Sequence, residues 1–116
     1  MIAVRMPRRS KYGAQAVVID GIRFASKREG KRYAELKLLA KAGEINALEI
    51  HPDFPVEIAT RKLFTYIADF SYYVPPRKAG EMWTRVVEDV KGIKTPVYKL
   101  KKKIVEAIYC FEITEV

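Results

Sequence analysis

Asp69, Asp89 and Lys91 are the residues whose types and spacing first indicate chemistry. Asp69 lies in the middle of a run of β-forming residues, and Asp89 lies among valines, although aspartate is disfavoured in strands. Side chains alternate along a strand, so Asp89 and Lys91 are expected on the same face as Val87, whereas Glu88 points to the other face. The pattern therefore predicts a carboxylate and an ammonium group that project together.

Pairing of these two strands as an antiparallel meander would place Asp69 across from Asp89 and Lys91. Two neighbouring carboxylates repel each other unless a cation lies between them. Mg²⁺ prefers carboxylate oxygens and keeps several waters, and two acids beside a lysine suit the hydrolysis of a phosphodiester. The alternative is purely structural, with Asp89 and Lys91 as a solvated ion pair and Asp69 as a charge that protects a sheet edge.

Glu29 is a third candidate carboxylate. It occupies the third helical position after Ser26, where a glutamate completes a capping box by bonding back to the start of the helix. It also shares a helical face with Tyr33, Leu36 and Ala40, which must pack against the sheet. Glu29 is therefore expected either to cap the helix or to reach the acids of the sheet.

The elements that must position these residues follow from turn and periodicity signals. Asp20-Gly21 between β-forming residues predicts a hairpin over 16–24, and the apolar spacing after Ser26 predicts a helix over 27–42 that ends at Gly43. A period of two then predicts three strands, over 46–58, 63–74 and 84–91.

The last part of the chain predicts a helix and a closing strand. Thr95 and Pro96 form a helix start, so a helix is expected over 96–109, and Phe111 and Ile113 begin a strand that runs to the C-terminus. The order after the hairpin is α-β-β-β-α-β, with the last strand parallel to an earlier one. We expect one α/β (α+β) domain, a mixed central sheet flanked by helices.

Composition excludes several classes of protein. The chain has 116 residues, of which 49% are hydrophobic and 31% charged, and no apolar run is long enough to span a membrane. One cysteine excludes an internal disulfide, and with one histidine it excludes the usual structural zinc sites. Without a secretory signal, the expected compartment is the reducing cytoplasm. His51 is expected to have no catalytic task.

The net charge of +8 predicts a polyanionic partner, with nucleic acid as the first candidate. The expected contacts with DNA phosphates come from a basic N-terminal arm over 1–11 and from the second helix; they are Arg8, Arg9, Lys11, Lys94, Lys99 and Lys102. No motif that recognises bases is present, so recognition of backbone shape is favoured. The lysines of the helix could also form an ordinary solvated face.

These residues together resemble the PD-(D/E)xK nuclease superfamily. Asp69, the Asp89-Val90-Lys91 motif twenty residues later, Glu29 and the order of elements carry the resemblance over residues 26–116. Within that superfamily the chain is most similar to small phage-encoded endonuclease-like proteins and to Holliday junction-resolving enzymes of the archaeal type. The first motif departs from the usual Pro-Asp, because Asp69 follows alanine; the literal Pro52-Asp53 is interpreted as coincidental.

The resemblance implies a restriction-endonuclease-like core and specific roles for the site residues. Glu29, Asp69, Asp89 and the backbone carbonyl of Val90 would hold one or two Mg²⁺ ions, with Mn²⁺ as a substitute. Lys91 would orient the attacking water or stabilise the charge that develops on the phosphate.

The implied function is that of a magnesium-dependent DNA endonuclease selective for four-way junctions. A resolvase that cuts two strands symmetrically needs two active sites, which implies a homodimer. Two alternatives remain: a nicking or end-processing nuclease indifferent to junctions, and a non-catalytic nucleic-acid-binding module with a nuclease-like fold. No membrane partner is expected.

Overall fold

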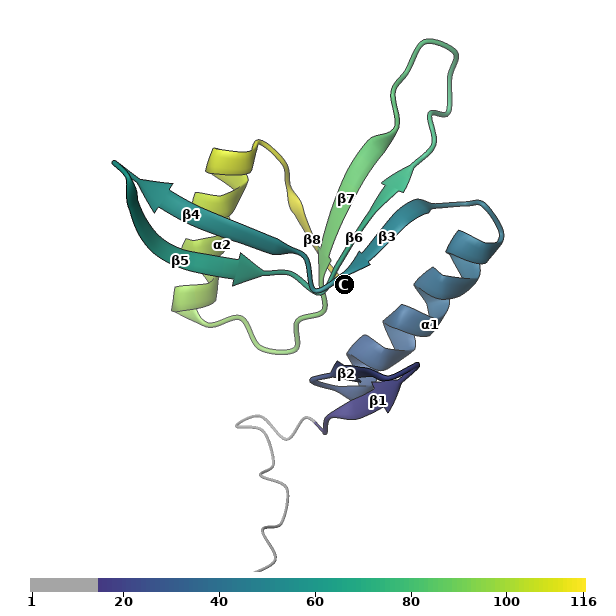
Figure 1. Ribbon diagram of the computed structural model, residues 1–116, viewed down its shortest axis with the longest axis horizontal. Coiled ribbons are helices and arrows are strands. Elements are labelled where there is room, and N and C mark those ends of the chain that lie inside the picture. The colour runs from purple at the N-terminus through teal and green to yellow at the C-terminus, as the bar shows by residue number, and fades with distance from the viewer. Residues whose placement is uncertain (1–14) are drawn as a thin grey trace, which may run out of the picture.

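A computed structural model describes residues 15–116, and it begins with the predicted hairpin (Figure 1). Strands β1 (Val17–Ile19) and β2 (Ile22–Phe24) pair antiparallel. Asp20 and Gly21 connect them with φ angles of 53° and 76°, the left-handed pair that a tight two-residue hairpin turn requires.

Helix α1 (Lys27–Lys41) begins where the capping pattern predicted. Ser26 has an extended backbone, and its side-chain oxygen accepts a hydrogen bond of 3.1 Å from the N–H of Glu29. The buried face of the helix consists of Glu29, Gly30, Tyr33 and Leu36. Glu29 therefore lies on the inward face, as its spacing from Tyr33 and Leu36 predicted.

Gly30 allows the hairpin to pack directly on the first turn of α1. A Cβ atom at this position would lie 2.8 Å from Cγ2 of Val17 and 2.9 Å from Cδ1 of Ile19. A larger residue here would force the side chains of Val17 and Ile19 to move. This close packing holds the helical turn that carries Glu29.

Four strands form the mixed sheet, in the order β3-β6-β7-β8. The β3–β6 and β6–β7 pairs are antiparallel, and β7–β8 is parallel. A mixed α/β fold with a three-strand meander and a parallel closing strand is thus confirmed. The strands are β3 (Asn46–Ile50), β6 (Phe70–Val74), β7 (Thr84–Asp89) and β8 (Ile113–Glu115).

The predicted strands over 46–58 and 63–74 are each divided in two. Their outer halves, β4 (Asp53–Ile58) and β5 (Arg61–Ile67), pair only with each other and form a separate two-stranded ribbon. The prediction of Asp69 in the middle of a strand is wrong, because Asp69 lies at the break between β5 and β6. Alternation of apolar residues on both sides of a break cannot reveal a change of direction.

The two breaks lie opposite each other and are joined by backbone hydrogen bonds. His51 donates its N–H to the carbonyl of Asp69 at 2.9 Å, and Ala68 donates to the carbonyl of Pro52 at 3.1 Å. His51 has a φ of 54°, an uncommon conformation for a residue with a side chain. Both chains therefore leave the sheet at the same point, and His51 and Asp69 are brought together there.

Helix α2 (Pro96–Tyr109) makes the crossover to the parallel strand and covers the predicted range. Thr95 caps it by accepting a hydrogen bond of 3.1 Å from the N–H of Tyr98. The helix ends at Cys110, which has a left-handed backbone. β7 is shorter than the predicted strand over 84–91, so Val90 and Lys91 follow the strand.

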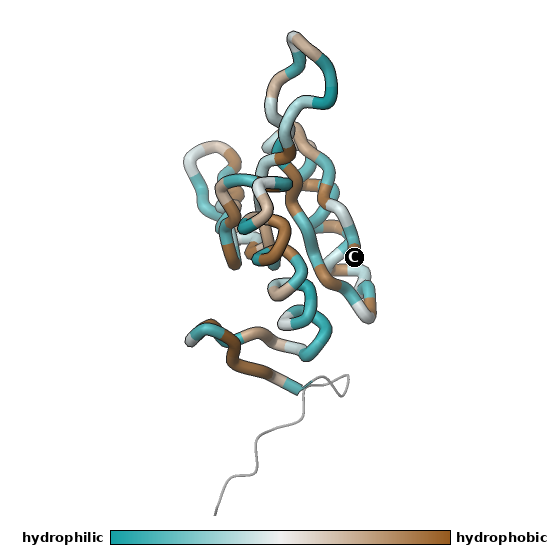
Figure 2. The backbone as a smooth tube through the Cα atoms, turned by 90° about the vertical axis from the view of Figure 1, so that its right-hand side faces the viewer, coloured by the Kyte–Doolittle hydropathy of each residue, from teal (hydrophilic) through white to brown (hydrophobic). Residues whose placement is uncertain are grey.

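The sheet separates two apolar cores. One contains Phe24, Tyr33, Leu36 and Phe70 beneath α1 and the hairpin, and the other contains residues of the β4–β5 ribbon, β7, β8 and α2. Figure 1 shows α1 and α2 on opposite sides of the sheet, and in Figure 2 the segment that follows the grey trace, strand β1, is coloured as hydrophobic. Neither described helix is long and apolar enough to cross a membrane.

Candidate active site

Glu29 both caps α1 and takes part in a cluster of charged groups. Its Oε2 accepts a hydrogen bond of 3.0 Å from the N–H of Ala25, and its side chain is 9% exposed. Burial and the negative charges of Asp69 and Asp89 raise the pKa of Glu29. Glu29 therefore caps the helix and also lies near the acids of the sheet, the two roles that were predicted as alternatives.

Asp69 is held against the end of β7 by backbone groups. Its Oδ2 accepts a hydrogen bond of 2.6 Å from the N–H of Val90, and its own N–H donates to the carbonyl of Glu88 at 3.1 Å. Burial raises the pKa of Asp69, although the Val90 N–H and the charge of Lys91 oppose the rise. The predicted proximity of Asp69 to the Asp89-Val90-Lys91 motif is thus present, and Val90 contributes its N–H.

Asp89 ends β7 and is completely buried. Within residues 15–116, neither of its carboxylate oxygens has a hydrogen-bond partner. Burial raises the pKa of Asp89 from 3.8 to about 6, although the ammonium group of Lys91 opposes the rise. An unpartnered buried carboxylate costs free energy, so its presence needs an explanation beyond packing.

Lys91 lies beside Asp89, as predicted, although it follows strand β7 and does not belong to it. Its Nζ is 3.9 Å from Oδ1 of Asp89 and 4.6 Å from the ring centroid of Tyr98, and the side chain is 28% exposed. The aromatic ring of α2 limits where the ammonium group can move. Lys91 therefore presents a positive charge to the acids from the α2 side.

His51 joins this site, although the sequence predicted no task for it. A ring nitrogen of His51 and carboxylate oxygens of Glu29 and Asp69 all lie within 4.8 Å of one another. The signal was the strand register, because Ile50 pairs with Phe70 and His51 is therefore opposite Asp69. That register cannot be known until the breaks in the two strands are placed.

The donor set fits a divalent metal ion. The carboxylates of Glu29 and Asp69 and the imidazole of His51 have donor atoms within 4.8 Å of one another. Asp89, which is buried and has no hydrogen-bond partner among residues 15–116, ends the neighbouring strand β7, and the next residue, Val90, donates its N–H to Asp69. Carboxylate oxygens bind Mg²⁺ and Mn²⁺, and a cation would offset the mutual repulsion and the burial of these acids. The residues that could hold such an ion are Glu29, His51, Asp69 and Asp89.

Glu88, the neighbour of Asp89, belongs to a different network on the opposite face of β7. Arg32 of α1 donates to both of its carboxylate oxygens, at 2.8 and 2.7 Å, and the Tyr72 hydroxyl donates to Oε2. Burial, together with the bond to Glu88, raises the pKa of Tyr72 to about 12. This network ties α1, which carries Glu29, to the strand that carries Asp89.

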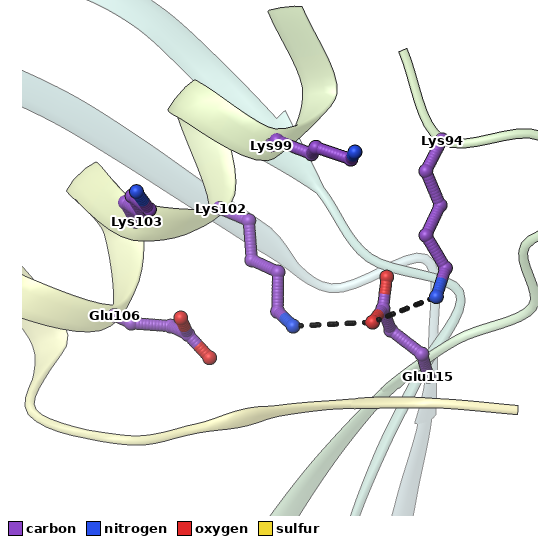
Figure 3. A pocket seen from close by; sticks show the side chains of 6 residues that line it. All are labelled: Lys94, Lys99, Lys102, Lys103, Glu106 and Glu115. Carbon is purple, nitrogen blue, oxygen red and sulfur yellow. Dashed lines mark ion pairs between the residues drawn. The ribbon is translucent and has the colours of Figure 1, made fainter. Parts of the chain in front are cut away.

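The predicted cations in and just before α2 lie around a hollow of about 410 Å³ (Figure 3). Glu115 lies between two of them, because Lys94 and Lys102 each approach its Oε1 to 3.3 Å. Tyr98 also donates a hydrogen bond of 3.0 Å to Glu115. The lining residues are Lys94, Lys99, Lys102, Lys103, Glu106 and Glu115.

A second, smaller hollow of about 170 Å³ lies beside α1, and the sequence did not indicate it. It is lined by Arg28, Lys31, Arg32, Glu35, Val90 and Val116. Val90 places this hollow next to the Asp89-Val90-Lys91 motif. Arg8, Arg9 and Lys11, the other predicted DNA contacts, lie outside the described residues.

A family model described as "Protein of unknown function (DUF1064)" matches residues 9–114, which is most of the chain. No curated protein and no solved structure matches the chain.

Proposed function

We propose that this chain, which belongs to the DUF1064 family, is a divalent-metal-dependent endonuclease that acts on branched DNA. The resemblance to PD-(D/E)xK nucleases supports the proposal through Glu29, Asp69, Asp89 and Lys91, the residues that carry it. The arrangement of those residues supplies independent support.

The single observation that carries the proposal is the environment of Asp89. Its carboxylate is completely buried and has no hydrogen-bond partner among residues 15–116, yet Asp69 and Lys91 lie beside it. A structural aspartate would be exposed or fully hydrogen-bonded. An aspartate that binds a cation during its reaction explains the unfavourable environment.

In this proposal each site residue has its own role in phosphodiester hydrolysis. Asp69 and Asp89, together with Glu29, would hold the ion, and the Val90 N–H keeps Asp69 oriented. The bound ion would activate water and neutralise charge on the phosphate. Lys91 is placed to stabilise negative charge on the reacting phosphate or to orient the water, and Tyr98 restricts its position.

Cations on either side of the acids support a DNA substrate. The α2 hollow contributes Lys99, Lys102 and Lys103. The positive charge of Lys102 opposes the rise that burial causes in the pKa of Asp89. The α1 hollow contributes Arg28 and Lys31. Phosphates on either side of a scissile bond would meet these groups while the acids hold the cation.

Selectivity for four-way junctions rests on the resemblance. A symmetrical pair of cuts needs two active sites, so the proposal includes a homodimer. The proposed compartment is the cytoplasm, of the host if the chain is encoded by a phage.

The test is cleavage of a labelled four-way junction, a nicked duplex and a linear duplex, each with Mg²⁺, Mn²⁺ or EDTA. Wild-type protein is compared with Asp89→Asn and with Asp53→Asn, a matched control because Asp53 is exposed at the start of β4. We expect metal-dependent paired cuts confined to the junction, loss of cutting in Asp89→Asn, and normal cutting in Asp53→Asn.

Each other outcome identifies an alternative. Metal-dependent cutting of all three substrates would support a nicking or end-processing nuclease and reject junction selectivity. Binding without cutting under every condition would reject the nuclease in favour of a nucleic-acid-binding module. Full cutting by Asp89→Asn would show that the site is wrongly assigned.

A further inference from the structure

The nuclease proposal does not use His51, although its ring lies in the site. Its ring nitrogen, with oxygens of Glu29 and Asp69, forms the group of donors that lie within 4.8 Å of one another. Among the described residues, no ion pair or hydrogen bond joins this ring to either carboxylate. A direct histidine–carboxylate contact therefore does not explain the cluster.

The spacing of these donors matches a shared ion. Ligands on opposite sides of a transition-metal ion lie about 4.2 Å apart, twice a metal–ligand distance of about 2.1 Å. Donors within 4.8 Å can reach that separation with side-chain movements below about 1 Å. The completely buried carboxylate of Asp89, which has no hydrogen-bond partner among residues 15–116, is an independent sign of a cation here, because the adjacent Val90 N–H bonds directly to Asp69.

The backbone holds His51 in place. The His51 N–H donates to the carbonyl of Asp69 at 2.9 Å, so the two ligands move together. The imidazole also packs 5.8 Å from the ring of Phe24, a buried core residue of the hairpin. Since Glu29 starts the helix beneath that hairpin, the sheet break and the hairpin fix all three donors.

We propose, on the basis of the metal-dependent function above, that His51 binds the same divalent ion as Glu29 and Asp69 and makes the site prefer Mn²⁺ to Mg²⁺. Mg²⁺ binds oxygen ligands almost exclusively, whereas a first-row transition-metal ion accepts an imidazole nitrogen readily. The imidazole would replace an oxygen ligand of the ion and so shift the preference. Mg²⁺ would bind through the carboxylates alone.

The decisive experiment uses Mn²⁺ itself as the probe, with electron spin echo envelope modulation spectroscopy. This method detects nitrogen nuclei bonded to Mn²⁺, and the chain contains a single histidine, so an imidazole signal has one source. We expect nitrogen modulation in the wild-type protein and none in His51→Asn. Asparagine is the conservative variant because it tolerates the φ of 54° and replaces the nitrogen donor with an amide oxygen.

Calorimetric titration supplies a second measurement on the same proteins. His51→Asn should weaken Mn²⁺ binding about tenfold or more and change Mg²⁺ binding less than about threefold. Asp53→Asn, an exposed change two residues away, should leave both affinities and the nitrogen modulation as in the wild type. Chemical denaturation of each variant shows that the compared proteins are folded.

The outcomes separate this inference from the proposed function. Metal-dependent DNA cutting by a Mn²⁺-loaded protein that shows no nitrogen modulation would overturn the role of His51 and leave the nuclease standing. Nitrogen modulation in a protein that cuts no DNA would support His51 as a ligand and overturn the nuclease. An unchanged ratio of Mn²⁺ to Mg²⁺ affinity in His51→Asn would overturn the metal preference.

Discussion

Two neighbouring carboxylates at the end of β7 have opposite surroundings. Glu88 is 1% exposed, and both of its oxygens accept hydrogen bonds, from Arg32 and Tyr72. Asp89 is fully buried, and no residue in the described part of the chain donates a hydrogen bond to its side chain. The alternation of a β-strand sends the two side chains to opposite faces of the sheet.

Glu88 therefore stabilises the fold, whereas the carboxylate of Asp89 is available to bind a ligand. The charge of Glu88 is balanced by Arg32, and both of its oxygens already accept hydrogen bonds, so Glu88 is held within the fold. Burial raises the pKa of Asp89 to about 6, so its ionised form destabilises the fold at neutral pH. Proteins keep such an arrangement where ligand binding compensates for it.

The largest expected effect concerns cleavage. Asp89→Asn should slow DNA cutting about 10³-fold, and Lys91→Ala about 10²-fold, because each removes a charge at the reacting phosphate or its metal ion. Glu88→Gln should change the rate per folded molecule less than about tenfold, since Glu88 faces the other side. Single-turnover cleavage of a junction measures all three rates.

Equal losses in Asp89→Asn and Glu88→Gln would contradict the division between the two acids. The fraction of folded protein, measured by circular dichroism, controls for a loss that comes only from unfolding.

For stability the expected order is the opposite of that for cleavage: substitution of Glu88 should destabilise the protein, and substitution of Asp89 should not. Glu88→Ala should lower the free energy of unfolding by about 3 kcal/mol, because Arg32 and Tyr72 lose their partner inside the protein. Glu49→Ala serves as the matched control: Glu49 is an exposed acid 4.0 Å from Arg85 and should cost less than about 0.5 kcal/mol. Urea denaturation in EDTA measures both, and similar values for the two variants would refute a structural role for Glu88.

Asp89→Asn should make the metal-free protein more stable by on the order of 1–2 kcal/mol at pH 7.5. The sign follows from the raised pKa: the folded protein binds the Asp89 proton more tightly than the unfolded chain, so the wild type loses stability as the pH rises from about 4 to about 6. The variant cannot ionise there and avoids this loss. The gain in free energy of unfolding of Asp89→Asn over the wild type should be small at pH 4 and constant above pH 7.

Urea denaturation in EDTA at several pH values tests this prediction. A variant less stable than the wild type at pH 7.5 would mean that the Asp89 carboxylate is favourably bound in the metal-free fold.

The smallest expected effect concerns the basic hollow beside α2. Lys99 lines this hollow, and no ion pair involves it in the described structure, whereas Glu115 pairs with Lys94 and Lys102. Lys99→Gln should weaken DNA binding a few-fold and reduce the slope of log affinity against log salt by about 1. Lys41→Gln, at the far end of α1, is the control and should leave the slope unchanged. Fluorescence anisotropy at several salt concentrations measures the slope, and an unchanged slope for Lys99→Gln would exclude a phosphate contact.

Much of the fold was predictable because its signals are local. The Asp20-Gly21 turn, the Ser26 and Thr95 caps and the spacing of Tyr33 and Leu36 each act within a few residues. The proximity of Lys91 to Asp89 was also expected from the sequence, although Lys91 follows β7 and strand alternation does not extend to it. Ion pairing of Lys94 and Lys102 with Glu115 was not predictable, since Glu115 lies on another element.

The sequence by itself determined the order of helices and strands, the inward position of Glu29 and the excess of positive charge. Only the tertiary structure decided that both long strands break at His51-Pro52 and Ala68-Asp69. It alone also decided that Asp89 is buried without a hydrogen-bond partner among residues 15–116, while Glu88 is paired with Arg32. Local preferences act through neighbouring residues, whereas the breaks and the pairing depend on backbone bonds and contacts between residues distant in the chain. For that reason the single histidine was recognised as part of the site only once the register of β3 and β6 was known.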